Sequence, residues 1–162
     1  MRPDRRTPTV RSIGRLSLLV VALSVSAGGT PVAGQAKQYP IFAAEHFITA
    51  MKTAGQAFAA VEASVGRSEL EDAKAYLAIS RDRLATTITF WRDRKKDDAI
   101  KMLRDTVAKL DEVDALLSAE KVDPAAVGAR VRQAGTSCEA CHAVYREQDP
   151  VTKAYRLKSG LD

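Results

Sequence analysis

Hydrophobic residues recur every three or four positions along most of the chain after residue 40, which is the spacing of one face of an α-helix. Residues 40–65 therefore predict a first amphipathic helix of about 25 residues. Its apolar face is formed by Ala44, Ile48, Met51, Gly55, Phe58 and Val65, interrupted only by Glu62 and widened by Phe47, Ala54 and Val61. After Gly66, the spacing of Ser68 and Glu71 is that of a capping box, which begins a second helix expected to end near Arg94.

The same period continues through two further segments. Asp97 is expected to cap a third helix, and Asp123 followed by Pro124 is a strong start for a fourth. The apolar side of this last helix carries Val127, Val131, Ala134, Cys138, Cys141 and Tyr145. Asp149-Pro150 is expected to end it. Four such helices with short connections and no alternating strand pattern predict an all-α protein, folded as an antiparallel up-down-up-down four-helix bundle.

The N-terminus has a different pattern. Five arginines and one acidic residue, Asp4, precede the apolar run of residues 16–27. A basic head and an apolar run too short to span a bilayer are typical of a secretory signal peptide, and a retained membrane anchor is the alternative. We expect residues 1–34 to be a cleaved signal peptide, residues 35–148 to be the four-helix domain and residues 149–162 to be a polar C-terminal tail. The expected location is the periplasm.

The formal charge of +5 would suit a nucleic-acid or anionic-membrane partner. Residues 1–34 carry five of the basic side chains and one of the acidic ones, so the mature chain has 20 basic and 19 acidic side chains and a net charge of +1. The charged run at residues 92–98 alternates in sign and is expected to be a solvated turn. The mature chain is therefore expected to bind no nucleic acid and to make no stable membrane insertion.

Cys138 and Cys141 are the only cysteines, and His142 follows the second one directly. This Cys-x-x-Cys-His order is the attachment pattern of a c-type haem. Each thiol can bond one vinyl group of the porphyrin, and the imidazole can reach the iron from one side of the ring. Positions three apart share a helix face, so both thiols can hold one porphyrin edge. The pattern predicts one covalently attached haem c with His142 bound to its iron.

Three other uses of the cysteine pair were considered. A thioredoxin-like redox motif needs a βαβ setting, which the helical pattern does not offer. A zinc site needs four ligands, and the mature chain offers only one further histidine, His46. A disulfide between the two cysteines suits an exported protein, so a disulfide-bonded helical bundle without haem stays as an alternative.

The fourth helix resembles the C-terminal helix of the cytochrome c-prime family and of its low-spin relatives of the cytochrome c-556 type. The resemblance covers about residues 38–148 and is carried by the run Cys138-Glu139-Ala140-Cys141-His142-Ala143-Val144-Tyr145-Arg146. It implies thioether bonds from both cysteines and His142 as the proximal iron ligand. It also implies that Tyr145 and Arg146 pack near the haem edge, with ordinary core packing and solvent exposure as their respective alternatives.

Within the family that this chain resembles, the residue that faces the iron opposite the proximal histidine, here His142, decides the function. A methionine on the first helix fills that position in the c-556 type, and a histidine-methionine pair suits electron transfer. In the c-prime type the position is open, and the iron binds NO or CO. Met51, four residues before Gly55, is similar to the c-556 pattern. Met51 and His142 are expected ~16 Å and ~9 Å from the same end of the bundle, whereas Met102 falls one position off the inner face.

We therefore expect a monohaem carrier of single electrons between periplasmic redox proteins, which is not an enzyme. The alternative is a high-spin, five-coordinate protein that binds NO or CO. One position departs from the family, because many members carry a basic residue one turn before the distal ligand and this chain has Phe47. Lys52 and Arg146 are the candidates to balance the haem propionates instead. The resemblance also allows a homodimer through the first two helices.

Overall fold

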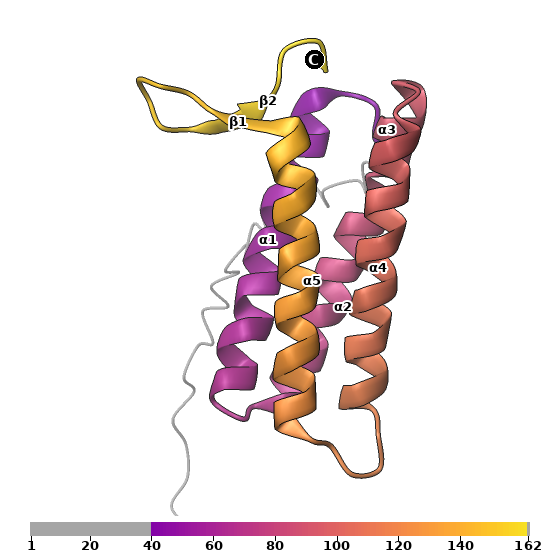
Figure 1. Ribbon diagram of the computed structural model, residues 1–162, viewed down its shortest axis with the longest axis vertical. Helices are drawn as coiled ribbons and strands as arrows, with labels where there is room; N and C mark the ends of the chain where they lie inside the picture. The colour runs from indigo at the N-terminus through magenta and orange to yellow at the C-terminus, as the bar shows by residue number, and fades with distance from the viewer. Residues whose placement is uncertain (1–39, 162) are drawn as a thin grey trace, which may run out of the picture. The chain divides into compact units, whose positions relative to one another are not determined.

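The computed structural model describes residues 40–161, so the expected signal peptide lies outside the described residues. Its elements are α1 (Ala44–Gly66), α2 (Leu70–Thr86), α3 (Ile88–Asp93), α4 (Asp97–Leu117), α5 (Pro124–Tyr145), β1 (Arg146–Gln148) and β2 (Tyr155–Leu157). The helix α1 packs against α2 and α5, and α4 packs against the same two helices. The loops after α1 and α4 lie at one end of the bundle, and α3 and the two strands lie at the other (Figure 1). The predicted all-α helical bundle is confirmed.

Two of the three predicted helix caps are wrong. The carboxylate of Asp123 accepts hydrogen bonds from the amides of Ala125 and Ala126 at 2.9 and 3.3 Å, as predicted for the start of α5. Ser68, in contrast, has a φ of 59° in the turn that closes α1, so it cannot adopt the extended backbone of an N-cap. Asp97 is the first residue inside α4 rather than its cap. Its carboxylate therefore interacts favourably with the positive end of the helix dipole but does not cap the helix.

The predicted second helix is interrupted at Thr87, which separates α2 from α3. The buried hydroxyl of Thr87 donates to the carbonyl oxygen of Leu84 at 2.7 Å, and the hydroxyl of Thr86 donates to Arg83 at 2.7 Å. Hydroxyls that bond backward to carbonyl groups compete with the helix ladder and bend helices. The interruption turns the short helix α3 so that Phe90 and Trp91 enter the core.

The buried face of α1 is displaced from the predicted one. It is formed by the six residues Phe47, Ala50, Ala54, Ala57, Val61 and Ser64. Its alanines leave room for a close neighbour, and the buried hydroxyl of Ser80 on α2 donates to the carbonyl oxygen of Ala54 at 3.0 Å. The larger predicted residues Ile48, Met51 and Phe58 are only partly buried. Helix α1 thus has one face of small residues that packs on α2 and a second, bulkier apolar face.

Four aromatic rings from α1, α3 and α5 form one aromatic cluster, consisting of Phe47, Phe90, Trp91 and Tyr145. The rings of Phe47 and Phe90 are stacked with centroids 4.1 Å apart, and the rings of Trp91 and Tyr145 are tilted at 4.7 Å. Stacked and tilted aromatic pairs add to the stabilisation from burial alone. The cluster joins three helices at the end of the bundle that carries the two strands.

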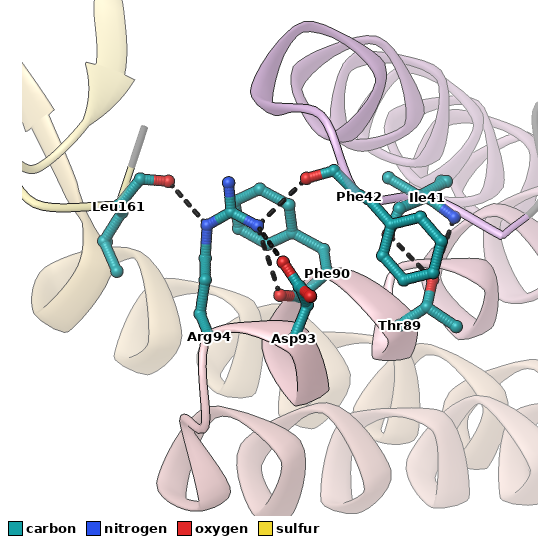
Figure 2. A network of polar contacts seen from close by, with 7 residues as sticks. All are labelled: Ile41, Phe42, Thr89, Phe90, Asp93, Arg94 and Leu161. Atoms are coloured by element: carbon teal, nitrogen blue, oxygen red, sulfur yellow. Dashed lines mark hydrogen bonds and ion pairs between the residues drawn. The ribbon is translucent and has the colours of Figure 1, made fainter.

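Arg94 fastens both ends of the described chain to α3 (Figure 2). Its guanidinium donates to the carbonyl oxygens of Leu161 and Phe42 at 2.8 and 2.9 Å, and it lies 3.7 Å from the centroid of the Phe90 ring. A carboxylate oxygen of Asp93 lies 3.6 Å away as an ion-pair partner. Within the segment expected to be a polar tail, residues 149–162, Leu161 is buried against the core.

The segment after α5 is an antiparallel C-terminal hairpin, residues 146–157, in which Arg146 pairs with Leu157 and Gln148 pairs with Tyr155. The carboxylate of Asp149 accepts hydrogen bonds from the amides of Val151 and Thr152 and so builds its turn. Helix α5 ends at Tyr145, before the predicted Asp149-Pro150, because the amide of Lys158 binds the Tyr145 carbonyl oxygen at 3.0 Å. This ending was not predictable from helical spacing, since the partner lies beyond the hairpin. Within residues 40–161, no helix has the length and apolar character that a membrane crossing requires.

Candidate functional site

A cavity of about 710 Å³ lies between the helices and reaches the C-terminal hairpin. Most of its wall is apolar and includes Phe58 of α1, Leu84 of α2, Trp91 of α3 and Leu103 and Leu110 of α4. Small-molecule and cofactor sites have volumes of about 300–1,000 Å³ and mainly apolar walls. The bulky second face of α1, which is too exposed for the core, therefore has a place in the wall of this cavity.

Helix α5 presents Cys138, Cys141 and His142 to the cavity. Both cysteines are half-buried and neither takes part in a disulfide. They lie three positions apart in an uninterrupted helix, so their thiols share one helix face. The structure therefore brings together the three residues of the Cys-x-x-Cys-His order on one wall.

Burial sets the protonation states of these three groups. It raises the pKa of the Cys138 thiol, with a further contribution from the charge of Glu62. Burial also raises the pKa of Cys141 to about 11, helped by the charges of Cys138 and Asp98. For His142, burial lowers the pKa, and the cationic Arg146 lowers it further. At neutral pH the site thus presents two neutral thiols and a neutral imidazole, which is the form of histidine that binds a metal.

Met51 lines the cavity from α1, so it shares the cavity with His142 of α5. Met102 of α4 lines it as well. As predicted, Met102 lies one position off the buried face of α4, which carries Ala99, Leu103 and Thr106, but the cavity extends past this face and reaches Met102. Two thioethers, rather than one, are therefore candidates for the position opposite His142.

Tyr145 and Arg146, for which the resemblance implies a place near the haem edge, both line the cavity. Tyr145 is buried in the aromatic cluster, and the nearby carboxylate of Asp98 adds to the effect of burial in raising its pKa. The Arg146 guanidinium lies 4.0 Å from the centroid of the Tyr155 ring. His46, the other histidine of the chain, is not part of the cavity wall. Among residues 40–161, no three His, Cys, Asp or Glu side chains form a group that could hold a metal ion.

The sequence did not predict that the C-terminal hairpin forms part of the cavity wall. Ala154, Tyr155, Arg156 and Leu157 line the cavity together with Arg146. The turn residues Asp149-Pro150 were a usable signal for a hairpin, since such pairs favour turn initiation. No local pattern, however, indicates that two three-residue strands fold back onto the end of a helical bundle.

Tyr145 offers a test of the electrostatics of this wall. Burial and the interaction with the Asp98 carboxylate raise the pKa of Tyr145 above its usual value near 10. Because the folded-state pKa is raised, the contribution of Tyr145 to stability is complete below pH 10 and is lost as the pH rises through the folded-state value. We expect the difference in phenolate absorbance between wild type and Tyr145→Phe to develop well above pH 10. Asp98→Asn should move it to lower pH, and a difference curve centred at pH 10 would contradict the assignment.

Comparisons with models of protein families, with curated proteins and with solved structures found no match for this chain. Its function is therefore inferred from the Cys-x-x-Cys-His order and from the residues that line the cavity. Both features can be read from the residues of this chain without a matching relative.

Proposed function

We propose that this chain is an exported monohaem c-type cytochrome, of the c-556 type, that carries single electrons between periplasmic redox proteins. The observation that carries the proposal is that Cys138, Cys141 and His142 line one mainly apolar cavity of about 710 Å³. A haem is a flat and largely apolar group, so it needs a site between helices rather than on the surface. The donor set fits it, since two free thiols and a neutral imidazole lie at positions 138, 141 and 142, on one side of α5.

Each residue has a distinct part in this proposal. Cys138 and Cys141 would hold the haem c by thioether bonds, and His142 and Met51 would bind its iron. When bound, the haem supplies a one-electron couple whose potential depends on the axial ligands and on burial. Phe58, Leu84, Leu103 and Leu110 line the cavity and would give one part of the haem an apolar surrounding. A carrier of this kind transfers electrons and is not an enzyme.

Gas binding is a second candidate function. Phe47, Ile48 and Phe58 line the cavity around Met51 and are all apolar. If the thioether of Met51 packs against these residues without binding iron, an apolar space for NO or CO remains on that side. A methionine on an apolar face fills irregular gaps in many cores, so packing is its ordinary use.

Covalent attachment of the pigment is the decisive test. The chain would be produced with its own export signal in a host that attaches haem to periplasmic proteins, and the purified protein extracted with acidified acetone. We expect the wild type to keep its colour and a Cys138→Ala/Cys141→Ala variant to lose it. Thr136→Ala is the matched control, because this hydroxyl donates only to the helix carbonyl of Arg132. A colourless wild type contradicts the proposal.

Optical spectra of the same material separate the two candidate functions. An electron carrier with a histidine-methionine pair is expected to show sharp low-spin bands when reduced and a weak sulfur-to-iron band near the red end when oxidised. A wild type that is high-spin and binds CO readily would instead support the gas-binding function.

A further inference from the structure

The C-terminal hairpin is a fixed part of the cavity wall. The amide of Lys158 donates to the carbonyl oxygen of Tyr145. The ammonium group of Lys158 donates to the carbonyl oxygen of Ala143 at 2.9 Å. Beyond it, Leu161 is buried and held by Arg94. The end of α5 and the chain after the hairpin are thereby tied to the bundle. The base of the hairpin is therefore held beside the cavity, while the Tyr155 side chain is 59% exposed.

Three cationic side chains line the cavity, and they differ in their partners. Arg156 is neutralised, since its guanidinium lies 2.9 Å from Glu147 and 3.5 Å from Asp149. Among residues 40–161, neither Arg146 nor Lys52 takes part in an ion pair. Two positive charges without an acidic partner therefore border a mainly apolar cavity.

Arg146 is the better ordered of these two charges. Its guanidinium lies 4.0 Å from the centroid of the Tyr155 ring, within the range of a cation–π contact. A guanidinium stacked on a ring keeps the N–H groups at its edge free for another partner. Lys52 is an exposed side chain of α1, and an ammonium group on a flexible stem is a less directed donor.

We propose that Arg146, positioned by Tyr155 of the C-terminal hairpin, binds a carboxylate of the ligand that fills the cavity. This inference rests on the proposed function, in which that carboxylate is a haem propionate. Guanidinium and carboxylate groups form short, paired hydrogen bonds, and these are strong where water is partly excluded. Tyr155 acts through Arg146 and is a positioning residue. The hairpin then selects ligands that carry an acid at this end of the cavity.

The test compares iron protoporphyrin IX, which has two carboxylates, with its dimethyl ester, in which both are capped. The full mature chain carrying Cys138→Ala and Cys141→Ala binds them without covalent attachment, and His142 is kept. Dissociation constants are measured by absorbance titration. We expect the diacid to bind about ten- to a hundredfold more tightly than the diester, because a hydrogen bond to a charged group is lost in the ester.

Variants in this background locate the effect. Arg146→Gln should lower the diacid-to-diester preference at least about tenfold, and Tyr155→Leu should lower it partly. Tyr155→Phe should retain the preference, because a phenyl ring can still stack on the guanidinium. Arg156→Gln is the matched control in the same wall, and its preference should be unchanged because Arg156 is already paired with Glu147 and Asp149. Circular dichroism confirms that each variant keeps its helices.

The outcomes that overturn the inference are distinct. An unchanged preference in Arg146→Gln overturns it while leaving porphyrin binding, and so the proposed function, intact. An equal loss in Arg156→Gln shows a general effect of the hairpin and also overturns it. A loss confined to Lys52→Gln assigns the carboxylate to α1 instead. Failure of the parent chain to bind either porphyrin contradicts the proposed function together with the inference.

Discussion

Met51→Ala is expected to convert the haem-loaded protein from a low-spin form into a high-spin form that binds carbon monoxide. The substitution removes the thioether that we propose as the ligand opposite His142, and alanine has no atom that can replace it. The weak sulfur-to-iron band should disappear from the oxidised spectrum. The midpoint potential should fall, within the span of about 0.8 V that axial ligands cover. Spectra with and without carbon monoxide measure the change.

Met102→Ala is the matched control, because Met102 lines the same cavity from α4 and loses the same side-chain volume. We expect it to keep the low-spin spectrum and to exclude carbon monoxide. If Met102→Ala becomes high-spin and Met51→Ala does not, the assignment of the ligand is reversed while the carrier function stands. If the spectrum stays unchanged even in the double variant Met51→Ala/Met102→Ala, no methionine binds the iron.

Phe90→Ala is expected to destabilise the fold by about 3–5 kcal/mol, the range measured for truncating buried phenylalanines. The Phe90 side chain is 0% exposed. Its ring stacks on Phe47 at 4.1 Å, meets Trp91 edge-on at 5.1 Å and lies under the guanidinium of Arg94. All of these contacts are lost together, and the cavity left behind lies between three helices. Urea unfolding followed by circular dichroism measures the loss as a lower midpoint.

Phe42→Ala is the corresponding control at the surface. The Phe42 side chain is 51% exposed, and its carbonyl oxygen, which accepts the hydrogen bond of Arg94, is kept by alanine. We expect a change within about 0.5 kcal/mol, as for most surface substitutions. Similar losses in the two variants would contradict the central place of Phe90 in the aromatic cluster.

The sequence by itself determined the elements whose causes are local. Apolar residues at helical spacing predicted the long helices, because this spacing alone decides whether one side of a helix can be buried. The start of α5 was predictable in detail, since Asp123 satisfies two free amides of the first turn and Pro124 needs no donor there. The spacing of Cys138, Cys141 and His142 likewise placed all three on one helix face without knowledge of the neighbouring helices.

The tertiary structure alone decided which apolar face meets which neighbour. Helix α1 has two such faces, and the one with the larger residues lines the cavity because the alanines allow the closer approach to α2. Met102 lines the cavity although it lies one position off the buried face of α4, because the cavity extends beyond that face. Two further features depend on contacts made only when the chain folds back after α5. The end of α5 at Tyr145 involves a hydrogen bond from Lys158, and the position of Tyr155 beside Arg146 involves stacking across the hairpin. Helical spacing describes one helix at a time, so it carries no information about contacts that exist only when the chain folds back on itself.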